Sequence, residues 1–233
     1  MKKLILMSGL VFSVGAIAEI TENTFETGVE EFTESTLEVN DVDFTDPTAA
    51  YSSLQVGYTT EGVDLGFGYA KSLTDDWAGL AYAQSLDSFD SYRVRAAALS
   101  TNFGTGLMGD YIYNTNNRIH TSALNIVQVL PLHERILLAP VLGVGAISGE
   151  SLDKNVPIAT AQLYTVFRFT DDVSMMVAPA YTKSLSDQTM KINTLDWDGN
   201  ISYRVNGNQN VSFSYSIKDI EDNTYGVNYT YAF

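Results

Sequence analysis

The sequence contains no cysteine, few basic residues and, after its first eighteen residues, no long apolar run. Without cysteine the fold cannot use the disulfides that often stabilise small exported proteins. The longest later apolar run, residues 136 to 147, contains Pro140, Gly143 and Gly145. It is also shorter than the roughly 20 residues that a membrane-spanning helix needs. A helical membrane anchor is therefore excluded for this part of the chain.

The shortage of basic residues limits the possible partners. Lys and Arg number 13 against 28 Asp and Glu, a formal net charge of −15. A nucleic-acid-binding protein needs a basic surface to displace counterions, so we expect no nucleic-acid partner. The two histidines, His120 and His133, should lie at opposite ends of one strand and cannot share a metal ion. No nucleotide motif or metal-ligand cluster stands out, and we predict no cofactor and no metal site.

The first eighteen residues have the organisation of a secretory signal peptide. Lys2 and Lys3 give a positive start, residues 4 to 17 give an apolar stretch, and residues 16 to 18 give a small-residue cleavage site. Acidic residues follow at once. We expect residues 1 to 18 to be a cleaved signal peptide and the mature chain to begin near Glu19.

The next segment, residues 19 to 48, holds ten acidic residues and no Lys or Arg. Its apolar residues are sparse, which is typical of a segment that is disordered or folds only on docking. We expect a flexible acidic arm that precedes a barrel over residues 49 to 233. One hypothesis places the arm at the mouth of the barrel, where it would partly block it, and the alternative is a solvated tether.

From residue 51 onward, apolar residues recur at every second position. The end of the chain shows this best, because Tyr225, Val227, Tyr229, Tyr231 and Phe233 alternate with small or polar residues. Successive side chains of a strand point to opposite faces, so one face here is apolar and the other is polar. Alternating segments of about 9–11 residues, separated by turn residues, are the signature of a membrane β-barrel.

Twelve such segments predict an all-β fold, a transmembrane antiparallel β-barrel. The segment near 119–130 is weakly patterned, because Leu124 and Ile126 favour one face while Val127 and Val129 favour the other. A bulge there, or a barrel of only ten strands, would explain the conflict. The segments lie near residues 51–59, 62–72, 77–86, 92–101, 106–114, 119–130, 135–147, 157–169, 173–184, 192–204, 210–219 and 224–233.

The links between segments also follow a pattern. Tight links should lie on one side of the barrel, and links that include several longer ones, such as 148–156 and 185–191, on the other. Barrels of the outer membrane place short turns in the periplasm and longer loops outside. With an even number of strands, both chain termini are then expected in the periplasm.

The last five residues, Tyr229-Thr230-Tyr231-Ala232-Phe233, resemble the C-terminal assembly signal of Gram-negative outer-membrane proteins, an aromatic last strand that ends in Phe. The sequence departs from this signal at Asn228, where the family often has Gly. The resemblance implies a barrel in the outer membrane of a Gram-negative bacterium, with outer-membrane lipid as one partner. It also implies recognition by the barrel-assembly machinery through Tyr229, Tyr231 and Phe233.

The polar face of the strands predicts the nature of the barrel interior. Charges are costly against lipid but tune selectivity inside a barrel. Twelve strands lie between the filled interior of about 8 strands and the open channel of about 16–18. We expect a narrow, porin-like passive channel for small polar solutes, and the alternative is a closed structural barrel. The charged residues expected in the lumen are Arg93, Arg95, Arg168, Arg204, Lys218, Asp64, Asp110, Asp196 and Asp198.

Small residues on the presumed inner face favour some open space in this interior. They could instead let the strands bend, because glycine in a strand marks corners and close approaches. These residues are Gly66, Gly68, Ala70, Gly79, Ala81, Ala83, Ala97, Gly143, Gly145, Ala178 and Ala180.

A lipid hydrolase is a further alternative. His120 and Ser122 share a face of one predicted strand, as a base and a nucleophile require. The pair is similar to the His-x-Ser pairs of outer-membrane phospholipase A and lipid A deacylase. Those enzymes have Asn after the Ser, whereas this sequence has Ala123, and no third residue that would orient His120 stands out. We therefore predict no enzyme and no catalytic residue.

Overall fold

The computed structural model describes residues 51–150, 152–186, 191–220 and 222–233. The predicted signal peptide and acidic arm, residues 1–18 and 19–48, lie outside the described residues. Thirteen strands and one short 3-10 turn, η1 (Asp87–Phe89), make up the regular structure of the described part. None of its helical segments is long and apolar enough to cross a membrane.

The strands follow one another along the chain and are joined by short links. Their bounds are β1 (Ser53–Thr59), β2 (Gly62–Thr74), β3 (Trp77–Leu86), β4 (Ser91–Ser100), β5 (Thr105–Asn114), β6 (Ile119–Gln128), β7 (Leu130–His133), β8 (Ile136–Gly149), β9 (Val156–Arg168), β10 (Val173–Ser184), β11 (Asn193–Asn206), β12 (Gln209–Ile217) and β13 (Thr224–Ala232).

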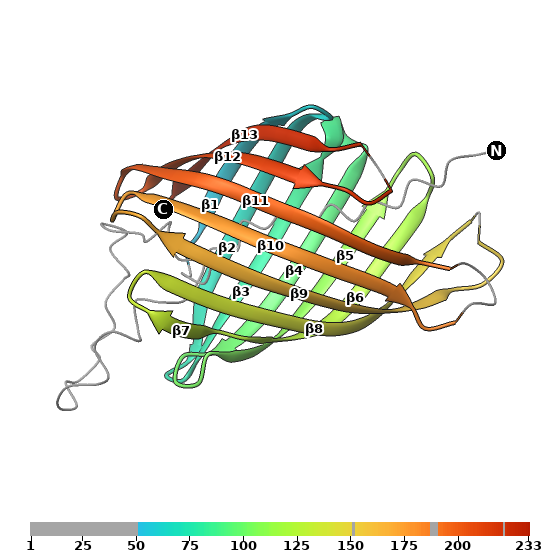
Figure 1. Cartoon of the computed structure of the whole chain (residues 1–233), viewed down its shortest axis with the longest axis horizontal. Coiled ribbons are helices and arrows are strands. Elements are labelled where there is room, and N and C mark those ends of the chain that lie inside the picture. Colours follow the sequence, from blue (N-terminus) through green and yellow to red (C-terminus); the bar gives the residue numbers. More distant parts are fainter. Residues whose placement is uncertain (1–50, 151, 187–190, 221) are drawn as a thin grey trace.

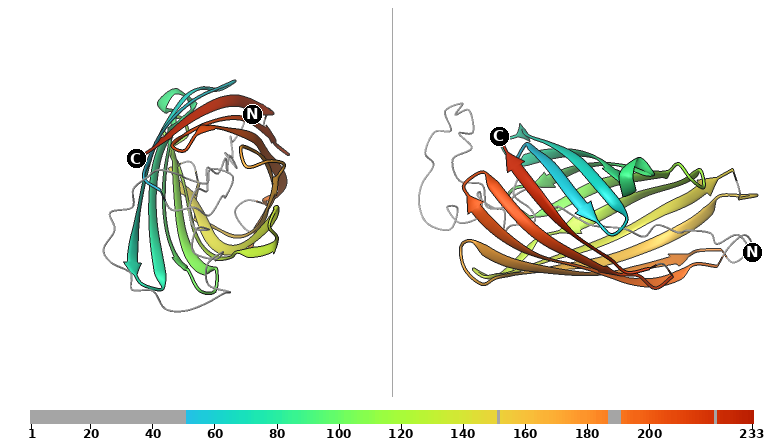
Figure 2. Two further views of the ribbon diagram at one scale, coloured as in Figure 1. Left: turned by 90° about the vertical axis from the view of Figure 1, so that its left-hand side faces the viewer. Right: turned by 90° about the horizontal axis from the view of Figure 1, so that it is seen from above.

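The sheet closes on itself as an antiparallel barrel (Figures 1 and 2). Strand β1 pairs with β13, and β6 pairs with β8. The short β7 continues β6 along β8, because Val127 pairs with Val141 and Leu130 with Leu138 in one unbroken register. The barrel therefore has twelve strands and one extra short strand, which confirms the predicted fold and decides against ten strands. A closed ring leaves no unpaired strand edge.

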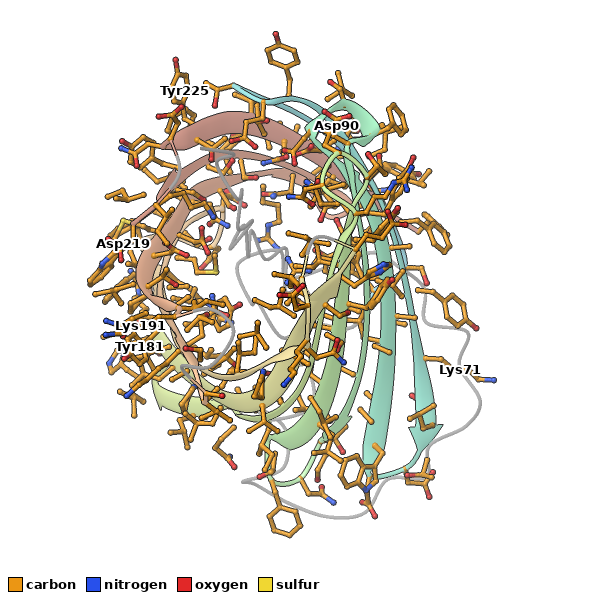
Figure 3. All side chains as sticks on the ribbon, turned by 90° about the vertical axis from the view of Figure 1, so that its right-hand side faces the viewer. Lys71, Asp90, Tyr181, Lys191, Asp219 and Tyr225 are labelled. Atoms are coloured by element: carbon orange, nitrogen blue, oxygen red, sulfur yellow. The ribbon has the colours of Figure 1, made fainter. Side chains whose placement is uncertain are left out.

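The predicted alternation holds in β13. Val227, Tyr229 and Tyr231 are exposed on the outside, whereas Asn228 and Thr230 are buried inside. The same rule gives the other long strands an apolar outer face, formed by large exposed side chains such as Leu65, Ile201 and Phe213. In Figure 3, which views the barrel from one end, Tyr225 and Lys71 point away from the interior.

Strand β6 resolves the conflict that its sequence presents. It pairs with β5 without a register shift, so no bulge is present. Leu124 and Ile126 are exposed on the outside, and Val127 and Val129 pack against buried apolar residues on the inside. Both faces of β6 are apolar at this point because the interior next to it is apolar.

Two expectations about small residues are wrong. In β3 the outward side carries Gly79, Ala81 and Ala83, while Tyr82 and Gln84 point inward. The small residues of β3 therefore lie on the outer face, where they take no lumenal space. The second error concerns the glycines of the inner face, which were expected to leave part of the barrel interior open.

The structure fills the space above several of these glycines. The hydroxyl of Tyr82 lies directly over Gly66, and the amide oxygen of Asn125 lies over Gly143. A Cβ atom at either glycine would collide with that group. These glycines therefore make room for a larger side chain of the next strand, which is one of the roles that glycine takes in strands.

The two ends of the barrel differ. One end, called here the turn end, carries the first and last described residues and short turns such as those at 75–76, 134–135 and 207–208. The opposite end, called here the loop end, carries η1 and the turn at 115–118, together with the ends of β8 and β10 and the beginnings of β9 and β11. Strands β8 to β11 have 12 to 14 residues, against 7 for β1 and 9 for β12 and β13. Strand β2 is also long, with 13 residues.

Candidate functional site

The inner surface of the barrel has two chemically different sides. The first, called here the polar wall, belongs to β11 to β13, β1 and β2. Inward positions of these strands carry buried hydroxyl, amide and carboxyl groups because their sequences alternate Ser, Thr, Asn or Asp with apolar residues. The polar wall comprises Asp196, Asp198, Ser202, Asn210, Ser214, Ser216, Asn228, Thr230, Ser53, Gln55 and Asp64.

The second side, called here the apolar wall, belongs mainly to β8, β9 and β10. These strands carry apolar residues at inward as well as outward positions, so both of their faces are apolar. Towards the turn end the buried cluster comprises Met108, Leu137, Ala139, Val141, Tyr164, Val166, Met176 and Ala178. Towards the loop end a second buried cluster comprises Ile119, Ile147, Val156, Ile158 and Ile192.

A buried charge cluster lies on β4 and β5, between the two walls. Asp110 accepts hydrogen bonds from Arg93, including one from Nε at 2.9 Å, and from Arg95 Nη2 at 2.6 Å. The Asp110 side chain is 8% exposed and the two Arg side chains 1% and 6%. A carboxylate held by two guanidinium groups in this way forms strong, charge-assisted hydrogen bonds. The two-residue spacing of Arg93 and Arg95 puts both on the inner face of β4, as alternation predicts.

A second charged group lies on the opposite side of the ring, on β11 and β12. Lys218 Nζ is 3.9 Å from Asp198 Oδ1, and Ser216 Oγ donates to the same carboxylate at 2.5 Å. Asp198 also interacts electrostatically with Arg93, six strands away around the barrel. The two groups therefore face each other across the interior.

Tyr164 of the apolar wall meets the charge cluster from the side. Its ring is 2% exposed, and the hydroxyl donates to Gln162 Oε1 at 2.7 Å. The same hydroxyl interacts electrostatically with Arg93 and Arg95. Buried polar side chains of β4, β9 and β11 thus face the same interior.

The remaining predicted lumenal charges form hydrogen bonds or ion pairs with loops and turns. Asp64 accepts a hydrogen bond from the backbone N–H of Asp87, and Asp196 accepts one from Asp219, each at 2.9 Å. At the turn end, Arg204 Nε pairs with Asp172 at 3.1 Å, and Arg168 Nη1 donates to the Glu134 carbonyl at 3.4 Å. Arg204 and Arg168 therefore contact turns rather than the middle of the interior.

A group of carboxylates lies at the loop end above the polar wall. Asp87 in η1 is partly buried next to Glu61 and Asp64. Burial raises the pKa of Asp87 to about 8, and the neighbouring Glu61 and Asp64 add to this effect. Asp87, Ser88 and Phe89 all have positive φ, a conformation that is uncommon outside glycine. Among the described residues no group of acidic or histidine side chains has the geometry of a metal site.

One cavity lies inside the barrel, against β5, β6, β8, β9, β10 and β11. It encloses about 970 Å³ of empty space, part of which is open to solvent. The inner side chains that bound it include Ile112, Ala123, Val141, Gln162 and Thr194.

His120 and Ser122 lie on the outer face of β6, as the alternation predicts. His120 Nδ1 is 2.5 Å from Tyr111 Oη, and its ring stacks on Tyr113 with centroids 4.6 Å apart. Within the described part of the chain, no hydrogen bond joins His120 to Ser122. His120 is held by two tyrosines of β5, and this geometry gives the hydrolase alternative no support.

The sequence analysis did not single out Tyr164, Gln162 or Tyr82 as interior residues of interest. Tyr82 Oη donates to Gln55 Oε1 at 2.8 Å and so links β3 to β1 inside the barrel. The available signal for Tyr164 was that it shares the polar face of its segment with Gln162 and Arg168. The alternation in β3 gives no such signal for Tyr82, because Leu80 and Leu86 share its face.

Comparison with known proteins places the fold. No protein-family model and no curated protein sequence matches the chain. The NanC porin structure superimposes with a TM-score of 0.57 at 6% identity, covering 77% of this chain and 98% of that chain. The KdgM porin gives 0.51 at 12% identity, covering 78% and 99%. A KdgM complex with disordered oligogalacturonate also gives 0.51 at 12% identity. This chain has the fold of the outer-membrane β-barrel porins.

Proposed function

We propose that this protein is an outer-membrane channel that lets small polar solutes pass passively. The observation that carries the proposal is the interior of the closed barrel, where charged side chains line the wall beside a cavity. Porins of known structure share the fold.

The proposed channel is narrow because twelve strands lie between the filled interior of about 8 strands and the open channel of about 16–18. Arg93 on β4, Tyr164 on β9 and Asp198 on β11 interact electrostatically across the interior. Three cations (Arg93, Arg95 and Lys218) stand against three carboxylates (Asp110, Asp196 and Asp198) in this interior. Such balanced charge favours small solutes without a large net charge. It gives no reason to expect a polyanion such as the oligogalacturonate of the KdgM complex.

The proposed location in the outer membrane follows from the outer face of the barrel. Large apolar side chains cover it, and unpaired apolar surface of this extent suits contact with lipid hydrocarbon. We place the turn end, where the described part of the chain begins at Tyr51 and ends at Phe233, in the periplasm and the loop end outside, because longer links face outward in barrels of this kind.

The test is single-channel recording on protein refolded into planar bilayers. We expect discrete conductance steps with weak preference between cations and anions. Arg95→Gln should shift that preference towards cations, since it removes one buried positive charge of the interior. Arg118→Gln is the matched control, because Arg118 loses the same charge on the exposed loop end, where it pairs with Glu150. Absence of steps above the bare bilayer would favour a closed structural barrel.

We also propose that β13 carries the signal for assembly. Tyr229, Tyr231 and Phe233 are exposed on the outer face, where a partner could read them during insertion. Phe233 also donates its backbone N–H to Ser52 at 3.0 Å, beside the closure of β13 on β1. Deleting Phe233 should lower the fraction of assembled barrel in cells while refolding in detergent continues. Equal assembly of both proteins in cells would contradict the proposal.

A further inference from the structure

The cavity described above differs chemically from the rest of the proposed path. Its apolar lining comes from both buried clusters, with Met108 and Val141 from one and Ile119, Ile147 and Ile158 from the other. The cavity therefore connects the apolar surfaces of the two ends. A path built only for ions would carry polar groups on all sides, so this cavity has a further use.

Two polar side chains in the lining have no hydrogen-bond partner among the described residues. They are Gln162, 8% exposed, through Nε2, and Thr194, 3% exposed, through Oγ1. The other amide atom of Gln162 accepts from Tyr164, which leaves Nε2 as the free donor. Leaving a buried donor unpaired costs free energy, so a ligand that accepts this hydrogen bond gains affinity.

The charge of the lining limits what that ligand can be. Of the described side chains that bound the cavity, only Asp110 is ionised, and Arg93 and Arg95 already hold it. A charged ligand would lose its hydration without meeting a free counter-charge, which is costly in a buried site. An uncharged ligand avoids this cost.

We propose that the cavity is a binding site for uncharged small molecules that have an apolar body and one hydroxyl or carbonyl group. The apolar body contacts the isoleucines and Val141, and the oxygen of the head group meets Gln162 Nε2 and Thr194 Oγ1. The inference deepens the proposed channel function, on which it rests, by naming a class of solute that dwells in the lumen during passage.

The first test measures binding without transport. Cyclohexanol is titrated into detergent-solubilised, refolded protein by calorimetry, with glucose and cyclohexanecarboxylate as comparison solutes. Glucose lacks the apolar body and the carboxylate carries a charge. We expect saturable binding of cyclohexanol that is at least about tenfold tighter than that of the other two. Equal or non-saturable binding of all three overturns the proposal.

Variants then locate the site. Gln162→Leu and the isosteric Thr194→Val should each weaken cyclohexanol binding by about 5- to 30-fold, the loss expected for one hydrogen bond to a buried group. Gln84→Leu is the matched control, because Gln84 is also buried with an unpaired amide oxygen but lies on β3, outside the cavity. Because all the proteins share one detergent, partition of cyclohexanol into micelles cancels in the comparison.

A filling variant gives independent evidence. Ala123→Leu places three extra carbon atoms in the cavity and should abolish the binding, whereas Ala81→Leu adds the same atoms on the outer face and should not. Unchanged affinity in both the filling variant and Gln162→Leu excludes this site.

Conductance recording separates the two proposals. A conducting barrel that does not bind cyclohexanol rejects the cavity and keeps the channel. A barrel that binds it saturably without conducting keeps the cavity and rejects passive transport.

Discussion

The polar wall and the apolar wall belong to the same closed sheet, yet they present different chemical groups to the interior. The polar wall places Asp198, Ser216 and their neighbours against the interior and meets lipid only through its outer residues. The apolar wall buries Val166 and Met176 on the inner side of strands whose outer side is also apolar. In the first, alternation of polar and apolar residues is strict. In the second it is largely lost.

This difference shows what a membrane barrel requires of its sequence. The outer face must be apolar on every strand, because lipid surrounds the whole ring. The inner face has no such uniform requirement, so each strand can supply polar or apolar groups according to what lies inside. The division of the interior into a polar and an apolar wall is therefore not imposed by the membrane. It points to solutes that have a polar and an apolar side.

The largest expected effect comes from breaking the charge cluster that joins the two walls. Asp110→Asn leaves Arg93 and Arg95 buried without a counter-charge. Loss of one partner of a buried ion pair costs about 3–5 kcal/mol, and here two cations are affected. We expect the free energy of unfolding, measured by urea titration in lipid vesicles, to fall by that amount.

The control for this prediction uses the exposed pair at the turn end. Asp172→Asn removes the partner of Arg204, but the Asp172 side chain is 56% exposed. Water then replaces the lost contact, and the cost should stay within about 1 kcal/mol. Equal losses of unfolding free energy for Asp110→Asn and Asp172→Asn would mean that the buried cluster stabilises the barrel no more than the exposed pair does.

The next prediction makes one residue of the apolar wall polar and one residue of the polar wall apolar. Val166→Thr adds a hydroxyl to the apolar wall without a change of shape, and an unpaired buried hydroxyl costs about 1–3 kcal/mol. The reverse exchange, Thr230→Val on the polar wall, removes a hydroxyl and should change stability by less than about 1 kcal/mol. Urea titration of both variants checks the asymmetry. Equal costs would show that the two walls have the same environment.

The two walls also explain which parts of the structure the sequence could predict. The strands, their order and the inward position of Arg93, Arg95 and Asp110 follow from alternation and short links, which are local properties. The cavity beside Gln162 does not, because it depends on which strands face one another across the ring. In β3 the pattern misled, since Gly79 and Ala81 lie on the lipid side, where small residues are tolerated but not demanded.

The same limit applies to individual contacts. The Tyr164 hydroxyl interacts electrostatically with Arg93 and Arg95, four strands away on β4, and no spacing along the chain encodes that distance. Similarly, Gly66 was expected to leave open space but makes room for Tyr82 of the next strand. Alternation fixes the side on which a residue points, and only the closed ring fixes what it meets.

The last prediction concerns the loop end, where the walls differ again. Above the polar wall lie the carboxyl groups of Glu61, Asp64 and Asp87, whereas the apolar wall ends in isoleucines. Burial raises the pKa of Asp87 to about 8, and an unfolded Asp has a pKa of about 4. Between these values the unfolded chain has lost the proton while the folded barrel retains it. Stability should therefore decrease as pH rises from about 4 to 8 and change no further above that range.

Asp87→Asn removes this dependence and keeps the backbone, because Asn tolerates the positive φ of this position. Its unfolding midpoint should equal that of the unchanged protein near pH 4 and exceed it most above pH 8. Asp153→Asn, in the exposed link above the apolar wall, is the control and should show no such divergence. A gain that is the same at every pH would assign the effect of Asp87→Asn to the turn itself. In that case the two sides of the loop end would differ in shape but not in their response to protons.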